Sequence, residues 1–340
     1  MPPDAEDRHA WERPGAHEVA PGVYRVPLPL PGDSLKAVNV YAIADGADRL
    51  VLVDGGWSLA ASQEQLRSSL DGIGFGLEHI REFLVTHVHR DHYTQAVALR
   101  RVTGASVSLG EGERASLEAF AVMTEHPDVA ILRAAGASEL AAMLAGFHGE
   151  RDLTDWEPPD RWLPDAVELP LRTRTLQVHA TPGHTRGHVV FSDPEHDLLF
   201  SGDHVLPHIT PSIGIEPARP PSPLRDYLGS LALIRSLPDA TLLPAHGPVG
   251  MSVHDRIDEL VAHHEQRLVA TLKALDHGAS TPFEVACALG WTRHDRRFGE
   301  LDEFNQMLAV HETIAHLRVL AERDLVRSEF IDGVEHFAAC

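Results

Sequence analysis

A short run of histidines around one aspartate, directly after an apolar strand, constrains the fold of this chain more than any other feature. The apolar run FLV predicts a buried strand, and residues 86–92 follow it with the sequence THVHRDH. His87 and His89 lie two residues apart, so a strand places both imidazoles on one side of the backbone. Asp91 and His92 come next, and we expect them on a turn, pointing in a different direction.

Four potential metal ligands in this one segment are more than a single ion takes from one stretch of chain, so the pattern favours two ions side by side. The alternative is a polar strand end with solvated histidines. Surface histidines seldom occur at this spacing with a carboxylate among them, which disfavours that alternative.

The motif resembles that of the metallo-β-lactamase superfamily, in which His-x-His-x-Asp-His follows a hydrophobic strand. The resemblance implies three further ligands, and the chain has a matching segment for each, in the family's order. These segments are TPGHT around His184, SGD ending at Asp203 and PAHG around His246. The earlier VDGG at residues 53–56 also matches, so the likeness covers about residues 23–247.

The resemblance also implies how the ligands are shared between two divalent ions. One ion takes His87, His89 and His184, the other takes Asp91, His92 and His246, and Asp203 bridges them. Such a pair of ions holds a shared water as hydroxide at neutral pH, and this hydroxide attacks an electrophilic carbonyl. Asp91 and Asp203 are the candidates for moving the proton to the leaving group. Zinc is the preferred ion, although iron and manganese suit the same ligands.

Several features of the chain differ from those typical of individual branches of the superfamily. These differences reduce the number of reactions that we expect it to catalyse. The bridging aspartate, and a start without the apolar core of a signal peptide, disfavour a class B β-lactamase. His89 disfavours a diiron flavoprotein, and no inserted nuclease domain of the RNA-processing branch is apparent. Residues 204–206 read HVL where a lactonase usually has a tyrosine. TPGHT resembles the glyoxalase II branch, whose members cleave thioesters, so we predict a hydrolase of carboxylic thioesters or esters.

Several alternatives stay open at this point: a lactonase, a phosphodiesterase or nuclease with the same metals, a mononuclear iron oxygenase, and a non-enzymatic DNA-binding regulator. The formal net charge of −21 gives a surface that repels phosphate backbones and anionic lipid heads. No window of the sequence approaches the apolar length of a membrane span. We therefore expect a cytoplasmic protein with a small acyl substrate and with neither nucleic acid nor membrane as a partner.

The order of strands and helices predicts an α/β fold of the α+β kind, an αββα sandwich of two sheets covered by helices. Strands are expected at 22–30, 38–44, 49–53, 105–109, 176–180, 187–191, 198–200 and 241–243. Helices are expected at 58–70, 93–102 and 224–237. The domain prediction is a disordered lead (1–17), a catalytic domain (18–252) with a helical insertion (111–162), and a winged-helix-like domain (253–340).

The last part of the chain has its own pattern. Helical periodicity at 255–275, a capping box at the start of a helix at Thr281, and a helix at 304–320 precede a hairpin at 326–337. This order resembles the winged-helix-like tail of the β-lactamase-like protein 2 group. A wing is often a DNA-binding element, but from residue 253 on there are 9 Lys and Arg against 16 Asp and Glu. The balance favours packing or a homodimer contact over nucleic acid.

Some side chains near the motifs have more than one interpretation. Asp54 is a strand-end cap or a carboxylate that supports a metal-binding histidine, and the resemblance favours the second. His188 is expected to make a structural hydrogen bond, and Gly202 to let the backbone approach the metals closely. The candidates for substrate contact are His204, His208 and Tyr227, of which Tyr227 is alternatively a packing residue.

Aromatic residues of the insertion either line a substrate pocket or, with more weight, anchor the insertion to the body; they are Phe147, Trp156 and Trp162. His263 and His264, on the long helix near the C-terminus, are expected to be solvated. Cys287 is expected in the core, and the two cysteines give no disulfide framework.

Overall fold

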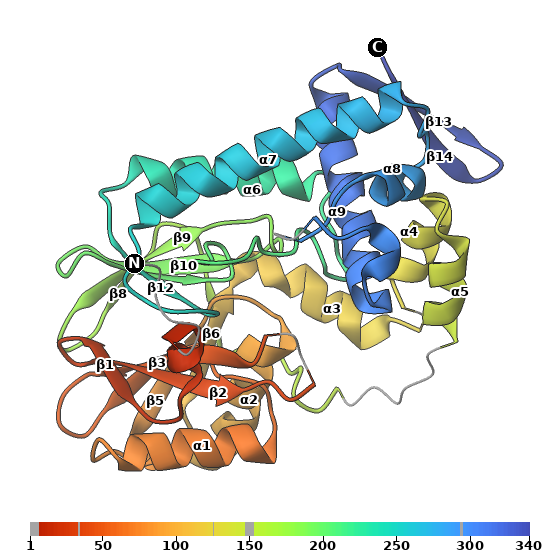
Figure 1. Ribbon diagram of the computed structural model, residues 1–340. Coiled ribbons are helices and arrows are strands. Elements are labelled where there is room, and N and C mark those ends of the chain that lie inside the picture. Colours follow the sequence, from red (N-terminus) through yellow and green to blue (C-terminus); the bar gives the residue numbers. More distant parts are fainter. Residues whose placement is uncertain (1–6, 33–34, 125, 147–152, 293–294) are drawn as a thin grey trace.

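Two β-sheets packed face to face form the centre of the computed structural model, which describes residues 7–32, 35–124, 126–146, 153–292 and 295–340 (Figure 1). The first sheet has the order β1-β2-β3-β4-β5-β6-β7 and the second the order β12-β11-β10-β9-β8. The first comprises β1 (His17–Ala20), β2 (Val23–Pro29), β3 (Ala37–Ala44), β4 (Leu50–Val53), β5 (Ile80–Val85), β6 (Ser106–Gly110) and β7 (Arg161–Leu163). The second comprises β8 (Glu168–Pro170), β9 (Thr175–Ala180), β10 (Val189–Asp193), β11 (Leu198–Gly202) and β12 (Thr241–Pro244).

Helices cover the outer face of each sheet. Figure 1 shows α1 and the neighbouring α2 below the first sheet, and α6 and α7 above the second. Their bounds are α1 (Ala60–Asp71), α2 (Arg90–Thr103), α6 (Pro223–Ser236) and α7 (Val253–Asp276). Separate hydrophobic clusters fill the space between the sheets and the space under each pair of helices. Between the sheets, the rings of Tyr41 and Phe200 meet edge to face at 5.4 Å. The expected αββα sandwich is confirmed.

The strand directions bring the site-bearing loops to one edge. β4 pairs in parallel with β5, and β11 pairs in parallel with β12. Because the carboxyl ends of parallel strands lie at the same edge of a sheet, Asp54 and the His87 segment emerge together, as do Asp203 and His246. The turn between the antiparallel strands β9 and β10 places His184 at the same edge.

The remaining helices belong to the insertion and to the C-terminal part. The insertion forms α3 (Arg114–Val122), α4 (Asp128–Ala134) and α5 (Ser138–Ala145); the C-terminal part forms α8 (Pro282–Ala288), α9 (Glu303–Glu322) and a hairpin of β13 (Val326–Ile331) and β14 (Val334–Ala339). Short 3-10 helices are η1 (Asp7–Glu12), η2 (Leu77–His79), η3 (Glu111–Glu113) and η4 (Phe298–Glu300). The predicted hairpin and the capping box of Thr281 with Glu284 are confirmed.

The insertion and the C-terminal helices share one hydrophobic core with the outer face of the second sheet. Leu132 of α4, Leu242 of β12 and Val310 of α9 belong to the same buried cluster. Figure 1 shows α4 and α5 beside α8 and α9, and the amide of Phe283 donates to the carbonyl of Ala135 over 3.0 Å. The predicted division at residue 252 stays a prediction, since packing is continuous across it.

Several local predictions were wrong. Asp91 and His92 lie in the first turn of α2 and not on a separate turn, since the helix begins at Arg90. The lead is ordered in part: η1 spans Asp7–Glu12, and the Arg25 guanidinium donates to the Trp11 carbonyl. Residues 1–6 lie outside the described part of the chain.

Two further expectations about burial were also wrong. The His264 side chain is 1% exposed and packs between α6 and α9, so it is not solvated. The Cys287 thiol lies on the exposed side of α8, while Val285 and Ala286 face the core. None of the helices among the described residues combines the length and the apolar character that a membrane crossing requires.

Candidate metal centre

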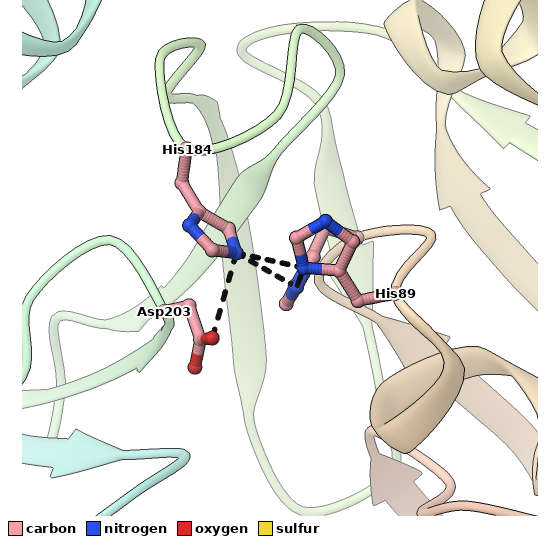
Figure 2. A group of neighbouring side chains, drawn as sticks. His89, His184 and Asp203 are labelled. Atoms are coloured by element: carbon pink, nitrogen blue, oxygen red, sulfur yellow. Dashed lines mark hydrogen bonds and ion pairs between the residues drawn. The ribbon is translucent and has the colours of Figure 1, made fainter. Parts of the chain in front are cut away.

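Four side chains from three loops converge on one point at the edge of the sandwich. The Nε2 atom of His184 lies 3.2 Å from Nε2 of His87, 3.0 Å from Nδ1 of His89 and 3.4 Å from Oδ2 of Asp203. His87 Nε2 and His89 Nδ1 are themselves 3.0 Å apart. Figure 2 shows His89 and His184 pointing toward one another, with Asp203 beside them.

A second group lies next to the first and shares the Asp203 carboxylate with it. The Oδ1 atom of Asp203 is 3.4 Å from Nε2 of His246 and 3.7 Å from Nε2 of His92. Asp91 Oδ2 is 3.5 Å from the same His246 nitrogen and 3.6 Å from the same His92 nitrogen. One oxygen of Asp203 thus faces each group, which is the geometry of a bridging carboxylate.

Backbone carbonyls fix the tautomers of two rings in the first group. The outer nitrogen of His89, Nε2, donates to the carbonyl of Ile215 over 2.8 Å. The outer nitrogen of His184, Nδ1, donates to the carbonyl of Ser212 over 2.6 Å. A neutral imidazole has one N–H, so the inner nitrogens of both rings carry lone pairs that face each other. Lone pairs this close repel each other, and a cation between them would remove the repulsion.

The second group is arranged in the same way. His92 Nδ1 donates to Asp54 Oδ2 over 2.8 Å, and His246 Nδ1 donates to the carbonyl of Ala37 over 2.9 Å. The inner Nε2 atoms of both rings, and Oδ1 of Asp203, are buried and have no hydrogen-bond partner among the described residues. Buried acceptors that lack a donor are costly, and a shared cation satisfies them all.

The spacing of the inner nitrogens suits a tetrahedral ion. A bond length of about 2.0–2.1 Å places two nitrogens on a tetrahedral zinc about 3.3 Å apart. The three separations in the first group are 3.0, 3.0 and 3.2 Å. The donor set of imidazoles and carboxylates fits zinc, iron or manganese equally well in kind.

The electrostatic environments of the two groups differ. Burial, with a further contribution from the neighbouring His89 ring, lowers the pKa of His184 to about 3. Burial also acts to lower the pKa of His92, but the charges of Asp91, Asp54 and Asp203 outweigh it and raise that pKa to about 10. Carboxylates that attract a proton to His92 attract a divalent cation to the same place.

Asp54 supports the site and is not merely a strand-end cap, as the resemblance implied. Besides the bond to His92, its carboxylate accepts from the amide and the hydroxyl of Thr86 over 2.8 and 2.9 Å. Asp54 takes a left-handed φ of 62° to reach these partners.

The backbone of Gly202 passes so close that a Cβ there would lie 2.6 Å from Oγ1 of Thr86. Gly202 therefore makes a close approach to Thr86, while the predicted approach to the metals stays a prediction.

His188 makes the structural hydrogen bonds that were expected of it. Its Nδ1 atom lies 2.9 Å from Oγ1 of Thr181, and its Nε2 atom accepts from the amide of Asp203 over 3.2 Å. The ring also stacks on His87 with centroids 5.0 Å apart. His188 therefore holds the backbone of Asp203 in place.

With this geometry established, comparison with known sequences identifies the family. A sequence model of the metallo-beta-lactamase superfamily matches residues 34–246, which is more than half of the 340 residues. The chain belongs to the metallo-beta-lactamase superfamily. The expected resemblance is confirmed.

Similar proteins include a thioesterase and a beta-lactamase-like protein. The chain is 26% identical over 323 residues to an atrochrysone carboxyl ACP thioesterase of Aspergillus fumigatus, with 91% of this chain and 62% of that protein covered. It is 25% identical over 253 residues to the beta-lactamase-like protein 2 homolog of Caenorhabditis elegans, covering 74% and 70%. The chain thus spans less than two thirds of the length of the first relative.

Solved structures agree along almost the whole chain. A metallo-beta-lactamase family protein from Thermus thermophilus has a TM-score of 0.72 at 29% identity, with 95% of this chain and 100% of that chain covered. A beta-lactamase domain protein from Burkholderia ambifaria has a TM-score of 0.75 at 26% identity, with 96% and 95% covered. With coverage this high, the likeness extends into the C-terminal helices.

In this metallo-beta-lactamase superfamily protein, the role of Glu113 was not predicted from the sequence. Its buried carboxyl group lies beneath the loops that carry His87 and His184. Glu113 is fully buried and accepts from the Thr185 hydroxyl and, over 3.4 Å, from the amide of Val88. It thereby joins the His87 and His184 loops. Burial and the nearby Glu216 carboxyl raise the pKa of Glu113 to about 8. A glutamate at the start of a helical insertion gives no sign of this role in the sequence.

The three residues that were expected to contact the substrate differ in their burial. His204 is fully buried between the rings of His188 and Tyr227, so it is a packing residue and the prediction was wrong. Tyr227 is also fully buried and donates to the His204 carbonyl over 2.9 Å, in keeping with its packing alternative. His208 is exposed on the loop after β11.

The aromatic residues of the insertion also differ in their surroundings. Trp156 packs against Phe120 and lines a cavity, whereas Trp162 lies in β7 under the guanidinium of Arg114. Phe147 lies outside the described residues.

Proposed function

We propose that this protein is a dinuclear metal-dependent hydrolase of carboxylic thioesters or esters. The observation that carries the proposal is the outward-facing hydrogen bonding of four histidines, which turns their lone pairs and the Asp203 carboxylate inward on two adjacent points. The first ion would be held by His87, His89 and His184, the second by Asp91, His92 and His246, and Asp203 would bridge them. Zinc is the ion we propose for both places.

The protein's own side chains would position the reactants and move one proton. When bound, the ions supply Lewis-acid chemistry, lowering the pKa of a water to roughly 7 and polarising a carbonyl oxygen. Of the seven ligands only His89 and Asp91 are partly exposed, so the substrate carbonyl approaches on their side. Asp91 is the carboxylate that can accept a proton there and return it to the departing thiolate or alkoxide. Asp203, held by His188, keeps the two groups in register.

Thioesters are preferred over phosphodiesters for two reasons. Relatives at about a quarter identity carry the name of an acyl carrier protein thioesterase. The net charge of −21 disfavours the charged backbone of a nucleic acid. The acidic C-terminal part, with its helices joined to the main core, is proposed to pack rather than to bind DNA.

Matched chromogenic substrates test this proposal on one zinc-loaded preparation. We expect kcat/KM for an acyl thioester or activated ester to exceed that for a phosphodiester by at least about a hundredfold, roughly 2.7 kcal/mol in transition-state binding. Phosphodiester cleavage at an equal or higher rate would move the protein to the nuclease class.

A further inference from the structure

A cavity of about 320 Å³ lies beside the metal centre, between the insertion and the loop that follows β11. Its walls are mainly apolar and come from Phe120, Met123, Leu153, Trp156, Ile215 and Pro217. This volume lies at the lower end of the range for sites that enclose small ligands. The cavity belongs to no part of the metal-binding motifs.

One wall of the cavity is the layer that holds the first ligand group. Ile215 lines the cavity with its side chain while its carbonyl accepts from His89 Nε2 over 2.8 Å. Glu216, the next residue, also lines the cavity and accepts from the amide of Arg186 over 2.6 Å, two residues beyond His184. A single residue, Ile215, therefore lies between a ligand in the cavity and the metal-ligating side chain of His89.

One of the partly exposed ligands, His89, is the residue that is hydrogen-bonded to the Ile215 wall. His89 and Asp91 are the partly exposed ligands, while the other five are buried. A substrate carbonyl that reaches the cluster on the His89 side brings the rest of its acyl group toward the Ile215 wall.

Aromatic rings form another part of the cavity wall. Phe120 and Trp156 pack with their centroids 4.6 Å apart and their planes tilted by 41°. Trp156 also lies 6.5 Å from the ring of Tyr93, whose hydroxyl donates to the carbonyl of Glu157. Flat ring walls of this kind favour an aromatic ligand, which packs against them in offset or edge-to-face geometry.

The charged groups at the end of the cavity already have partners. Asp128 is paired with the Arg219 guanidinium at 3.0 Å and lies 3.2 Å from Nε2 of His311. Glu216 accepts from the Ser116 hydroxyl over 2.5 Å. Neither carboxyl therefore calls for a cationic ligand, and both disfavour a carboxylate or phosphate on the bound group.

We propose that this cavity binds the apolar, ring-bearing acyl group of the substrate while the scissile carbonyl lies at His89 and Asp91. The assignment rests on the proposed hydrolase function and names the acyl class that the function left open. Met123, which follows the last residue of α3, is one of the residues that line this cavity.

Binding of a neutral naphthyl ketone, 2-acetonaphthone, tests the cavity without any reaction. The ketone has the ring system but neither a scissile bond nor a carboxylate that would bind metal. Met123→Trp fills the cavity, and we expect it to weaken binding of the ketone at least tenfold in titration calorimetry of the zinc-loaded protein. Val122→Trp is the matched control, because Val122 is 78% exposed at the end of the same helix; we expect a change below twofold. Leu153→Trp, at the cavity edge, gives the same test if Met123→Trp fails to fold.

Kinetics with N-acetylcysteamine thioesters then separate this inference from the proposed reaction. In Met123→Trp, the ratio of kcat/KM for the 2-naphthoyl thioester to that for the acetyl thioester falls at least tenfold, and in Val122→Trp it does not change. Ketone binding in the expected pattern with neither thioester hydrolysed would refute the reaction and keep the cavity. Equal ketone binding by both variants, or none by the natural chain, would overturn the cavity assignment.

Discussion

Replacing Asp54 by asparagine tests whether the outer hydrogen bonds set the metal affinity. The Asp54 carboxylate accepts from Thr86 with one oxygen and from Nδ1 of His92, over 2.8 Å, with the other. Asparagine can keep an oxygen toward Thr86, but its NH₂ group then faces the N–H of His92. A lost hydrogen bond to a charged acceptor costs about 1.5–3 kcal/mol, so we expect about 10- to 100-fold weaker binding of the ion at His92.

The effect is expected at one ion only. Thr86 keeps its acceptor in Asp54→Asn, so the contact of its hydroxyl with Nδ1 of His87, at 3.0 Å, is retained. Zinc titration of the chelator-stripped protein against an indicator dye should therefore show one site weakened and one unchanged.

A buried carboxylate far from the metals provides the control. Asp193, at the other end of β10, is fully buried and paired with Arg174 at 2.8 Å. Asp193→Asn should lower the unfolding temperature without changing either zinc affinity. Equal weakening of both sites in Asp54→Asn, or no weakening at all, would refute the argument that the Asp54–His92 bond orients a ligand.

The metal content, the bridging carboxylate and one buried histidine give three more tests. Elemental analysis of protein purified with added zinc should approach two ions per chain, and a firm ceiling of one would exclude the dinuclear site. Asp203→Ala should lose at least one ion and most activity while its circular dichroism is retained; full metal content with normal turnover would show that another group bridges. Burial lowers the pKa of His316 to about 4, so His316 folds neutral and gains a proton on unfolding below about 6.5. The contribution of His316 to the free energy of unfolding should therefore be constant above about pH 6.5 and fall toward pH 4 by about 2–3 kcal/mol, a slope that His316→Gln reduces in urea unfolding.

The ligand set could be predicted because its members occur in short, ordered motifs. His87 and His89 follow a strand that the apolar run makes evident, and Gly202 marks the close approach at the second sheet. The αββα layers follow from the same strands, since each buries one face between the sheets and one under helices. These features are local in sequence, or repeat with the period of a strand.

The supporting atoms could not be predicted, since most of them are backbone carbonyls. Ala37, Ser212 and Ile215 fix the histidine tautomers through their C=O groups, which every residue possesses. Which carbonyl groups take this role depends on where two loops that are far apart in the sequence lie side by side in the fold. Glu113 was missed for the same reason, because its role exists only where the insertion crosses beneath the metal loops.

The turn expected at Asp91 and His92 was wrong because the helix begins one residue earlier, at Arg90. His89 has extended dihedrals and acts as the N-cap, so Asp91 falls in the first turn of α2. A carboxylate in that turn interacts favourably with the positive end of the helix. The motif is therefore also a helix start, and the change of direction between the histidine pair and the Asp91–His92 pair arises from this strand-to-helix transition.

The two ligand groups differ in the pKa values of their histidines, and this difference follows from the position of the carboxylates. The first group has a triangle of imidazoles, two of them buried, and burial lowers the pKa of His184 to about 3. Around His92, Asp91, Asp54 and Asp203 overcome burial and raise its pKa to about 10. Protons therefore compete for the second group at neutral pH and hardly at all for the first. An ion beside Asp91 would therefore be the one that a proton displaces more readily.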